Sequence, residues 1–147
     1  MRAAAKIDAK PSLTIRRRFN AAPAKVFAAF TEPKTIARWF GPPGVTEVHA
    51  ETDLRVGGRY RIVAKMANDQ HEVMGVYREI VPNERLVYTW AWKSTPERES
   101  LVTIQLKADG AGTLLTLTHE QFIDEPARDR HQRGWAGALD KLEALFA

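Results

Sequence analysis

Two histidines near the C-terminal end of the chain are the residues best suited to chemistry. The side chains of His119 and His131 titrate near neutral pH, which suits proton transfer to or from a substrate. The same side chains can instead form ordinary hydrogen bonds in a folded core, and the sequence leaves both interpretations open. Two histidines without an identifiable third ligand rarely hold zinc. The sequence therefore predicts no metal site and no cofactor, and it assigns no catalytic residue.

The chain lacks the motifs that accompany several kinds of enzyme. It contains no cysteine, so disulfides, thiolate metal sites and a cysteine nucleophile are excluded. Neither a nucleophile elbow nor a phosphate-binding loop is present, because the glycines of 41–44 and 57–58 have the wrong spacing. These absences favour a binding protein over an enzyme.

The most informative segment is 86–92, in which large rings alternate with smaller residues. In a strand, this period of two places four large side chains on one face, namely Leu86, Tyr88, Trp90 and Trp92. Such an apolar wall needs a cover, which is a packed helix, a partner or a ligand. The segment therefore predicts either a pocket or a filled aromatic core beside this strand.

Further side chains are candidates for lining the same pocket. His131 and Trp135 are four residues apart, so on a helix they share a face that can oppose the wall. Arg17 lies on the face of its strand that should point inward. There it either anchors a carboxylate or phosphate of a ligand or pairs with an acidic side chain of the protein. Trp39 and Phe40 form a gate, a partner-binding knob or a plug. The candidate ligand-binding residues are Arg17, Trp39, Phe40, Tyr60, Tyr88, Trp90, Trp92, His119, His131 and Trp135.

The elements that must position these side chains follow from the hydrophobic pattern. Residues 13–19 alternate as in a half-buried strand, and Pro23 and Pro33 each suit the first turn of a short helix. After the Gly-Pro-Pro-Gly turn at 41–44, which forbids a helix, short apolar runs and turns indicate antiparallel strands. These strands are expected at 45–51, 59–66, 73–80, 86–92, 101–107 and 113–119.

The last segment predicts a long amphipathic helix that starts near Asp124. Its apolar residues recur at spacings of three and four, and they need a sheet to pack on. Gly134 and Gly137 each lower the stability of a helix by about 1 kcal/mol relative to alanine. Their expected compensation is a close approach of the helix to the sheet or room for a guest molecule.

Composition indicates one globular domain. A chain of 147 residues, with 44% hydrophobic and 27% charged residues, fits a single domain over 12–147 behind a flexible leader at 1–11. No apolar run is long enough to span a membrane or resembles a secretory signal, so a cytoplasmic protein is expected. Nucleic-acid binding is not expected, because the arginines at 16–18 point to alternate faces of a strand.

Several motifs in this order resemble those of one protein family. They are Leu13–Phe19, Ala22-Pro23, Trp39–Pro42, Asp53 with Gly57-Gly58, Gly75–Pro82, Leu86–Trp90, Gly112-Thr113 and Gly134-Trp135. Together they resemble the activator of heat shock protein 90 ATPase homologue family, within the START-related SRPBCC superfamily. The resemblance implies an α+β helix-grip fold, START-like or Bet v-like. In such a fold a curved antiparallel sheet of about six to seven strands wraps a long C-terminal helix.

The resemblance also implies a hydrophobic cavity between the sheet and the C-terminal helix. Members of the superfamily carry lipids, bind hormones, cyclise polyketides or assist chaperones in the stress response, and a shared fold does not fix the chemistry. The first expectation is a small binding module that holds an apolar or aromatic ligand without covalent chemistry. Two alternatives stay open: a polyketide cyclase-like enzyme that uses a pocket histidine or tyrosine, and a regulator of a chaperone ATPase.

Overall fold

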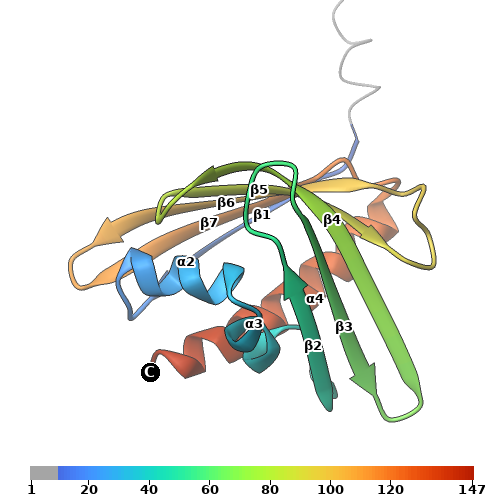
Figure 1. Cartoon of the computed structure of the whole chain (residues 1–147), viewed down its shortest axis with the longest axis horizontal. Coiled ribbons are helices and arrows are strands. Elements are labelled where there is room, and N and C mark those ends of the chain that lie inside the picture. The colour runs from blue at the N-terminus through green and yellow to red at the C-terminus, as the bar shows by residue number, and fades with distance from the viewer. Residues whose placement is uncertain (1–9) are drawn as a thin grey trace, which may run out of the picture.

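The computed structural model describes residues 10–147, which form one curved antiparallel sheet with helices on its concave side (Figure 1). The strand order across the sheet is β1-β7-β6-β5-β4-β3-β2. The strands are β1 (Leu13–Phe19), β2 (Glu47–Thr52), β3 (Arg59–Met66), β4 (Asp69–Val81), β5 (Arg85–Trp92), β6 (Ser100–Asp109) and β7 (Gly112–Glu120); the helices are α2 (Pro23–Thr31), α3 (Pro33–Trp39) and α4 (Glu125–Leu145). The expected α+β helix-grip fold is confirmed. The leader expected at 1–11 lies mostly outside the described residues.

Strands β1 and β3 have the predicted bounds, and the other strands differ from the prediction by a few residues at their ends. β4 is longer than expected, because Met66 pairs with Asp69 across a short turn and continues the ladder to the end of the hairpin. β2 begins at Glu47 rather than Val45, because the Val45 N–H donates to the Pro42 carbonyl in the preceding turn. The hydrophobic period thus predicts each strand, while the turns decide where it ends.

Helices α2 and α3 pack inside the bent sheet, α3 against β2 and α2 against β6 and β7. Each helix has proline in its first turn, where the missing N–H is not needed. α2 ends at Thr31 because Pro33, two residues later, cannot continue a helix. The buried residues of the two helices are Val26, Phe27, Ala29, Phe30, Thr31, Ile36 and Trp39.

The long helix α4 crosses the concave face of the sheet (Figure 1). Its start is fixed by Asp124, whose carboxylate accepts a hydrogen bond from the Ala127 N–H at 2.8 Å. Its buried stripe consists of Ala127, Trp135, Ala138, Leu139 and Leu142. Beside this stripe, Arg17 of β1 donates to Asp140 at 2.6 Å and attaches the helix to the edge strand. No helix within residues 10–147 is long and apolar enough to cross a membrane.

A close approach at Gly75 interrupts the ladder between β4 and β5. The Tyr60 hydroxyl reaches across Gly75 and donates to the Thr89 carbonyl at 2.6 Å. The Thr89 hydroxyl in turn accepts from the Val76 N–H at 2.8 Å. These side-chain bonds replace ladder bonds, and the part of the sheet formed by β2, β3 and β4 turns away from the other strands (Figure 1). This close approach needs a residue without a side chain at position 75, and just beyond it the register of the two strands shifts between Tyr77 and Glu79.

Gly75→Ala tests this close approach. The added Cβ would lie 1.9 Å from the Thr89 oxygen and 2.7 Å from the Tyr60 ring, so the backbone must shift. We expect the free energy of unfolding, measured in urea, to fall by about 3 kcal/mol, at the upper end for overpacking. Gly134→Ala is the control, because its Cβ meets nothing within 4 Å and should raise stability by about 0.5–1 kcal/mol. Equal effects of the two substitutions would contradict the role assigned to Gly75.

Candidate functional site

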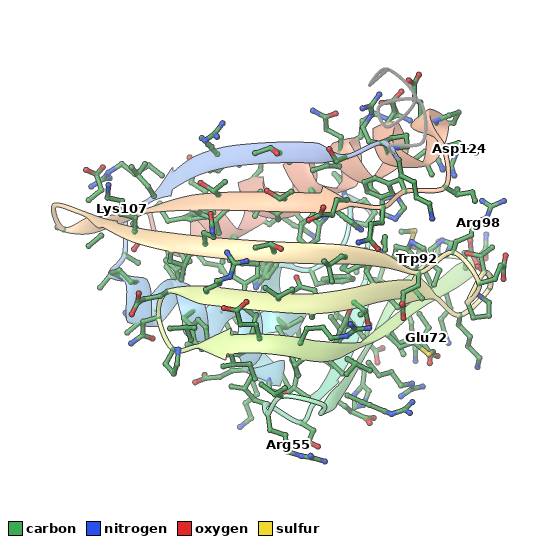
Figure 2. The ribbon with its side chains drawn as sticks, turned by 90° about the horizontal axis from the view of Figure 1, so that it is seen from above. Arg55, Glu72, Trp92, Arg98, Lys107 and Asp124 are labelled. Atoms are coloured by element: carbon green, nitrogen blue, oxygen red, sulfur yellow. The ribbon has the colours of Figure 1, made fainter. Side chains whose placement is uncertain are left out.

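An open groove of about 680 Å³ lies between the first half of α4, the turn after α3 and the loop after β5. We call it the outer groove; Trp92 and Arg98 mark its end of the molecule in Figure 2. Its aromatic lining consists of Phe40, His71, Trp90, Trp92, His131 and Trp135. Small or aliphatic residues complete much of the wall, among them Gly41, Pro42, Pro43, Ala64, Gly134 and Ala138. Three exposed arginines, Arg98, Arg130 and Arg133, also line it.

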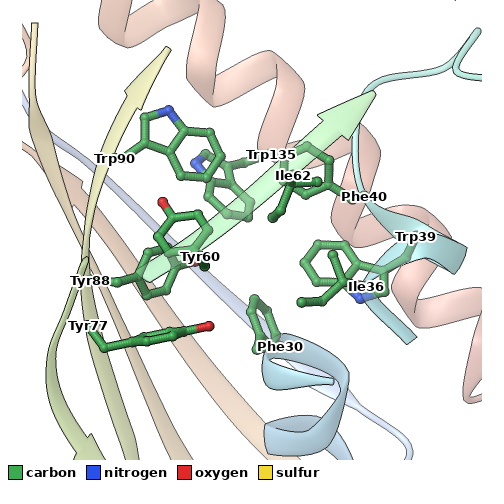
Figure 3. A pocket seen from close by; sticks show the side chains of 10 residues that line it. All are labelled: Phe30, Ile36, Trp39, Phe40, Tyr60, Ile62, Tyr77, Tyr88, Trp90 and Trp135. Atoms are coloured by element: carbon green, nitrogen blue, oxygen red, sulfur yellow. The ribbon is translucent and has the colours of Figure 1, made fainter. Parts of the chain in front are cut away.

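A second, inner cavity has a volume of only about 20 Å³, which is room for a single water molecule. It is lined by Phe30, Ile36, Trp39, Phe40, Tyr60, Ile62, Tyr77, Tyr88, Trp90 and Trp135 (Figure 3). Three of these residues, Phe40, Trp90 and Trp135, also line the outer groove and form the wall between the two spaces. The interior under the centre of the sheet is therefore filled with rings, and the open space lies beyond this wall.

The side chains around the inner cavity carry no charge. Burial raises the pKa of Tyr77 to about 12, with a smaller contribution from the charge of Asp53. Burial also raises the pKa of Tyr60 and of Tyr88 above the ordinary value, and neighbouring phenols add to both shifts. The Trp90 indole N–H is buried and has no hydrogen-bond partner among the described residues. The inner cavity and its wall thus present a neutral, largely apolar surface.

A hydrogen-bond chain fixes the orientation of Trp92 in the outer groove. The Trp92 indole N–H donates to His131 Nε2 at 2.8 Å, so Nε2 carries no hydrogen. His131 Nδ1 lies 2.7 Å from the Ala127 carbonyl and therefore donates to it. Burial lowers the pKa of His131, the Ala127 hydrogen bond opposes this shift, and the charge of Arg130 adds to it. The imidazole that lines the groove is consequently neutral.

A second chain fixes the orientation of Trp135. Its indole N–H donates to His119 Nδ1 at 3.0 Å, so His119 carries its hydrogen on Nε2. His119 Nε2 donates to Ser100 Oγ at 2.7 Å, and the Ser100 hydroxyl donates to the Trp90 carbonyl at 3.3 Å. Burial, with help from His131, lowers the pKa of His119 well below its usual range. His119 is thus a neutral, fully buried support for Trp135.

These two hydrogen-bond chains limit the chemistry that His119 and His131 can perform. Each ring nitrogen of His119 and His131 already has a partner, so neither imidazole has a nitrogen directed at the groove. Ser100 is not an activated nucleophile, because His119 Nε2 donates to it and cannot accept its proton. Within residues 10–147, no group of three or more His, Asp or Glu side chains is placed to hold a metal ion. The arrangement suits the orientation of tryptophans rather than proton transfer.

The structure brings most of the predicted pocket residues to one of the two spaces. Trp92 and His131 line the outer groove, Trp39, Tyr60 and Tyr88 line the inner cavity, and Phe40, Trp90 and Trp135 line both. His119 lines neither, because it lies buried behind Trp135. Arg17 also lines neither space. It donates to Asp140 at 2.6 Å and lies 3.7 Å from Glu143, so the ion pair, and not the ligand anchor, is what the structure contains.

Of the three roles considered for Trp39 and Phe40, the burial of both rings leaves the plug and the gate open and argues against the knob. Trp39 is 2% exposed, and its indole N–H donates to the Ala29 carbonyl at 2.9 Å. Phe40 is 6% exposed, and its carbonyl accepts from Lys141 of α4 at 3.2 Å. A partner-binding knob at these residues is therefore wrong, because neither ring is on the surface.

Sequence reasoning missed the three arginines of the outer groove. Arg130 and Arg133 appear on the polar side of a helical pattern, which usually means a solvated face. One signal in the sequence could have indicated them: Arg130 and Arg133 share a face of the helix beside Gly134, a residue with no side chain. Arg98 lies in the loop after β5, and no periodicity predicts where such a loop packs.

Comparison with known protein families gives a match over most of the chain. A family model described as "Activator of Hsp90 ATPase homolog 1-like protein" matches residues 20–147. The chain is similar to the activator of 90 kDa heat shock protein ATPase homolog 1 of Homo sapiens, with 22% identity over 123 residues. This similarity covers 84% of the chain and 33% of the human protein, so the chain spans about a third of this relative.

Solved structures are similar over nearly the whole chain. Protein CV1439 from Chromobacterium violaceum has a TM-score of 0.81 and 28% identity, covering 92% of this chain and 96% of that one. CalU16 from Micromonospora echinospora has a TM-score of 0.71 and 30% identity, covering 92% of this chain and 76% of that one. The AHSA1 protein from Silicibacter pomeroyi has a TM-score of 0.78 and 26% identity, with coverages of 91% and 96%.

The buried His119 and the half-buried His131 make stability depend on pH. Burial lowers the pKa of both groups in the folded protein, whereas in the unfolded chain they titrate near about 6.5. Below that pH the unfolded state binds protons that the folded state does not, so stability is lost as the pH falls. Between pH 7 and 5 we expect the free energy of unfolding to fall, with a slope approaching about 1.4 kcal/mol per pH unit for His119 and a smaller slope for His131, whose pKa is lowered less.

The same measurement on two variants shows which histidine causes the pH dependence of the free energy of unfolding. His119→Gln should reduce the slope by the share of one histidine, because the titrating group is gone. Ser100→Ala is the control: it removes the hydrogen bond to His119 Nε2 and lowers stability, but it keeps the buried imidazole and its slope. A slope that is the same in wild type and His119→Gln would contradict the neutral, buried state of His119.

Proposed function

This chain belongs to the family of Activator of Hsp90 ATPase homolog 1-like proteins, and we propose that it is a binding module for an apolar or aromatic small molecule. The proposed binding site is the outer groove. The observation that carries this proposal is a preformed space of about 680 Å³ with predominantly apolar walls. Small-molecule sites have volumes of about 300–1,000 Å³ and walls of this kind.

Rigid walls favour binding in the outer groove. Trp92 is held by His131, and Trp135 is held by His119, through indole hydrogen bonds of 2.8 and 3.0 Å. Side chains that are already ordered lose little entropy when a ligand packs against them. The Trp90 and Trp92 rings meet edge to face, with centroids 5.5 Å apart, and a flat apolar molecule can pack against such a corner.

The glycines of α4 support the same proposal. A Cβ at Gly137 would lie 3.1 Å from Pro43, so this glycine allows the turn after α3 to approach the helix. No close contact of this kind explains the glycine at position 134. A Cβ there would meet nothing within 4 Å, and Gly134 lines the outer groove. A glycine that weakens its helix by about 1 kcal/mol without a packing role is explained if its absent side chain leaves room for a ligand.

Gly134→Leu tests the proposed site without harming the fold. Leucine is the better helix former, and its Cβ would meet nothing within 4 Å, so stability should not decrease. It should reduce the affinity for N-phenylnaphthylamine, a neutral fluorescent aromatic probe, by about tenfold or more because it occupies the groove. Gln132→Leu, which puts the same side chain on an exposed part of α4, is the matched control. Unchanged affinity in Gly134→Leu would remove the outer groove as the site.

Regulation of a chaperone is a second candidate function, favoured by the similarity to the human ATPase activator. It predicts that adding this chain changes the ATPase rate of a 90 kDa heat shock protein in a steady-state assay. The chain covers 33% of the human relative, so the assay should also include the full-length relative as a positive control. If the ATPase rate does not change and the probe still binds in the groove, the chaperone role is wrong and only the small-molecule role remains.

A further inference from the structure

We propose that the ligand of the outer groove is an aromatic anion, whose acidic group is bound by Arg98, Arg130 and Arg133. This inference rests on the proposed binding function and names the class of ligand. The acidic group is a carboxylate, sulfonate or phosphate, each of which matches the planar donor fork of a guanidinium. The rings of the ligand face the tryptophans, and its charge faces the arginines.

The arginines approach the groove from two elements. Arg130 and Arg133 are three residues apart on α4, so they share a face of the helix beside Gly134. Arg98 comes from the loop after β5, and Figure 2 shows it beyond Trp92, at the end of the molecule where α4 begins near Asp124. Cations that border one groove from two sides can contact a single acidic group between them.

The charge of the groove is one-sided. None of the residues that line it is an aspartate or a glutamate, and the imidazole of His131 is neutral; the nearest carboxylate is that of Asp69, 3.2 Å from the lining residue His71. Arg130 and Arg133 have no carboxylate within 4.0 Å among the described residues, and the Arg98 Nε atom is 4.0 Å from Glu97. Six arginines outside the groove lie within 4.0 Å of a carboxylate, namely Arg17, Arg18, Arg55, Arg61, Arg85 and Arg128, whereas Arg16, Arg38, Arg59 and Arg78 have no such partner among the described residues. The groove therefore retains positive charge that an anionic ligand can use.

Position beside an apolar wall increases the effect of these charges. A charge at the boundary of a low-dielectric groove interacts more strongly with a bound anion than a charge surrounded by water. Cations that line a cleft also raise the rate at which anions enter it. A neutral aromatic ligand would gain only the apolar contacts, so the structure favours a molecule with both parts.

Two fluorescent probes of nearly identical shape test the proposal on the full chain. Anilinonaphthalene sulfonate carries an anionic group, and N-phenylnaphthylamine has the same ring system without it. We expect wild-type protein to bind the sulfonate about tenfold more tightly at low ionic strength, which corresponds to charge-assisted contacts of about 1.4 kcal/mol. The difference should shrink with added salt, because the arginines are exposed and become screened.

Arginine variants assign the anion contact. The double substitution R130Q and R133Q should reduce the affinity for the sulfonate about tenfold and leave the affinity for N-phenylnaphthylamine unchanged. The double substitution R59Q and R78Q is the control, because both arginines are exposed, lie outside the groove lining and reduce net charge by the same amount when replaced. It should change neither affinity.

The outcomes separate this inference from the proposed function. If wild type binds both probes equally, or if the groove variant with R130Q and R133Q retains the preference for the sulfonate, the anion proposal is wrong and the groove proposal stands. If the control variant with R59Q and R78Q lowers sulfonate affinity as much as the groove variant does, net charge and not the groove arginines causes the preference, which also overturns the proposal. If neither probe binds, both the groove proposal and the anion proposal are wrong.

Discussion

Two tryptophan–histidine hydrogen bonds join α4 to the sheet, and the shape of the site depends on them. In one, Trp92 of β5 donates to His131 of the helix; in the other, Trp135 of the helix donates to His119 of β7. The two bonds run in opposite directions between the same two layers, so they fix both the distance and the rotation of the helix. The rings they orient are also walls of the cavities. Attachment of the helix and shaping of the groove are therefore one set of contacts.

Both bonds require a neutral imidazole. The groove therefore has an uncharged aromatic part and a separate cationic part. An indole N–H needs a ring nitrogen without hydrogen, and the remaining nitrogen must then donate to the Ala127 carbonyl or to Ser100. The histidines consequently bring no positive charge to the aromatic part of the groove. The cations of the groove are the arginines on α4 and on the loop after β5, away from the packed core. This division matches a molecule with an apolar body and one charged end.

The elements of the fold could be predicted because they depend on near neighbours in the sequence. A period of two gives β1 and the inward direction of Trp90, and a proline in the first turn gives α2 and α3. The partners of individual side chains could not be predicted in this way. Arg17 meets Asp140 across a separation of 123 residues, and His119 meets Ser100 across 19. The place of the groove was equally hidden, because the turn after α3 and the loop after β5 that border it have no repeating pattern.

The position of the open space follows from the sizes of the side chains between the helix and the sheet. Under the centre of the sheet, rings such as Phe30, Tyr60 and Tyr88 fill the gap and leave room for about one water. In the outer groove small residues such as Ala64 and Gly134 lie among the rings, while the tryptophan–histidine bonds hold the helix at its distance. Volume that the small side chains do not fill must then remain open, because the helix cannot move inward to close it. The aromatic wall is thus part of the core on its inner side and lines the pocket on its outer side.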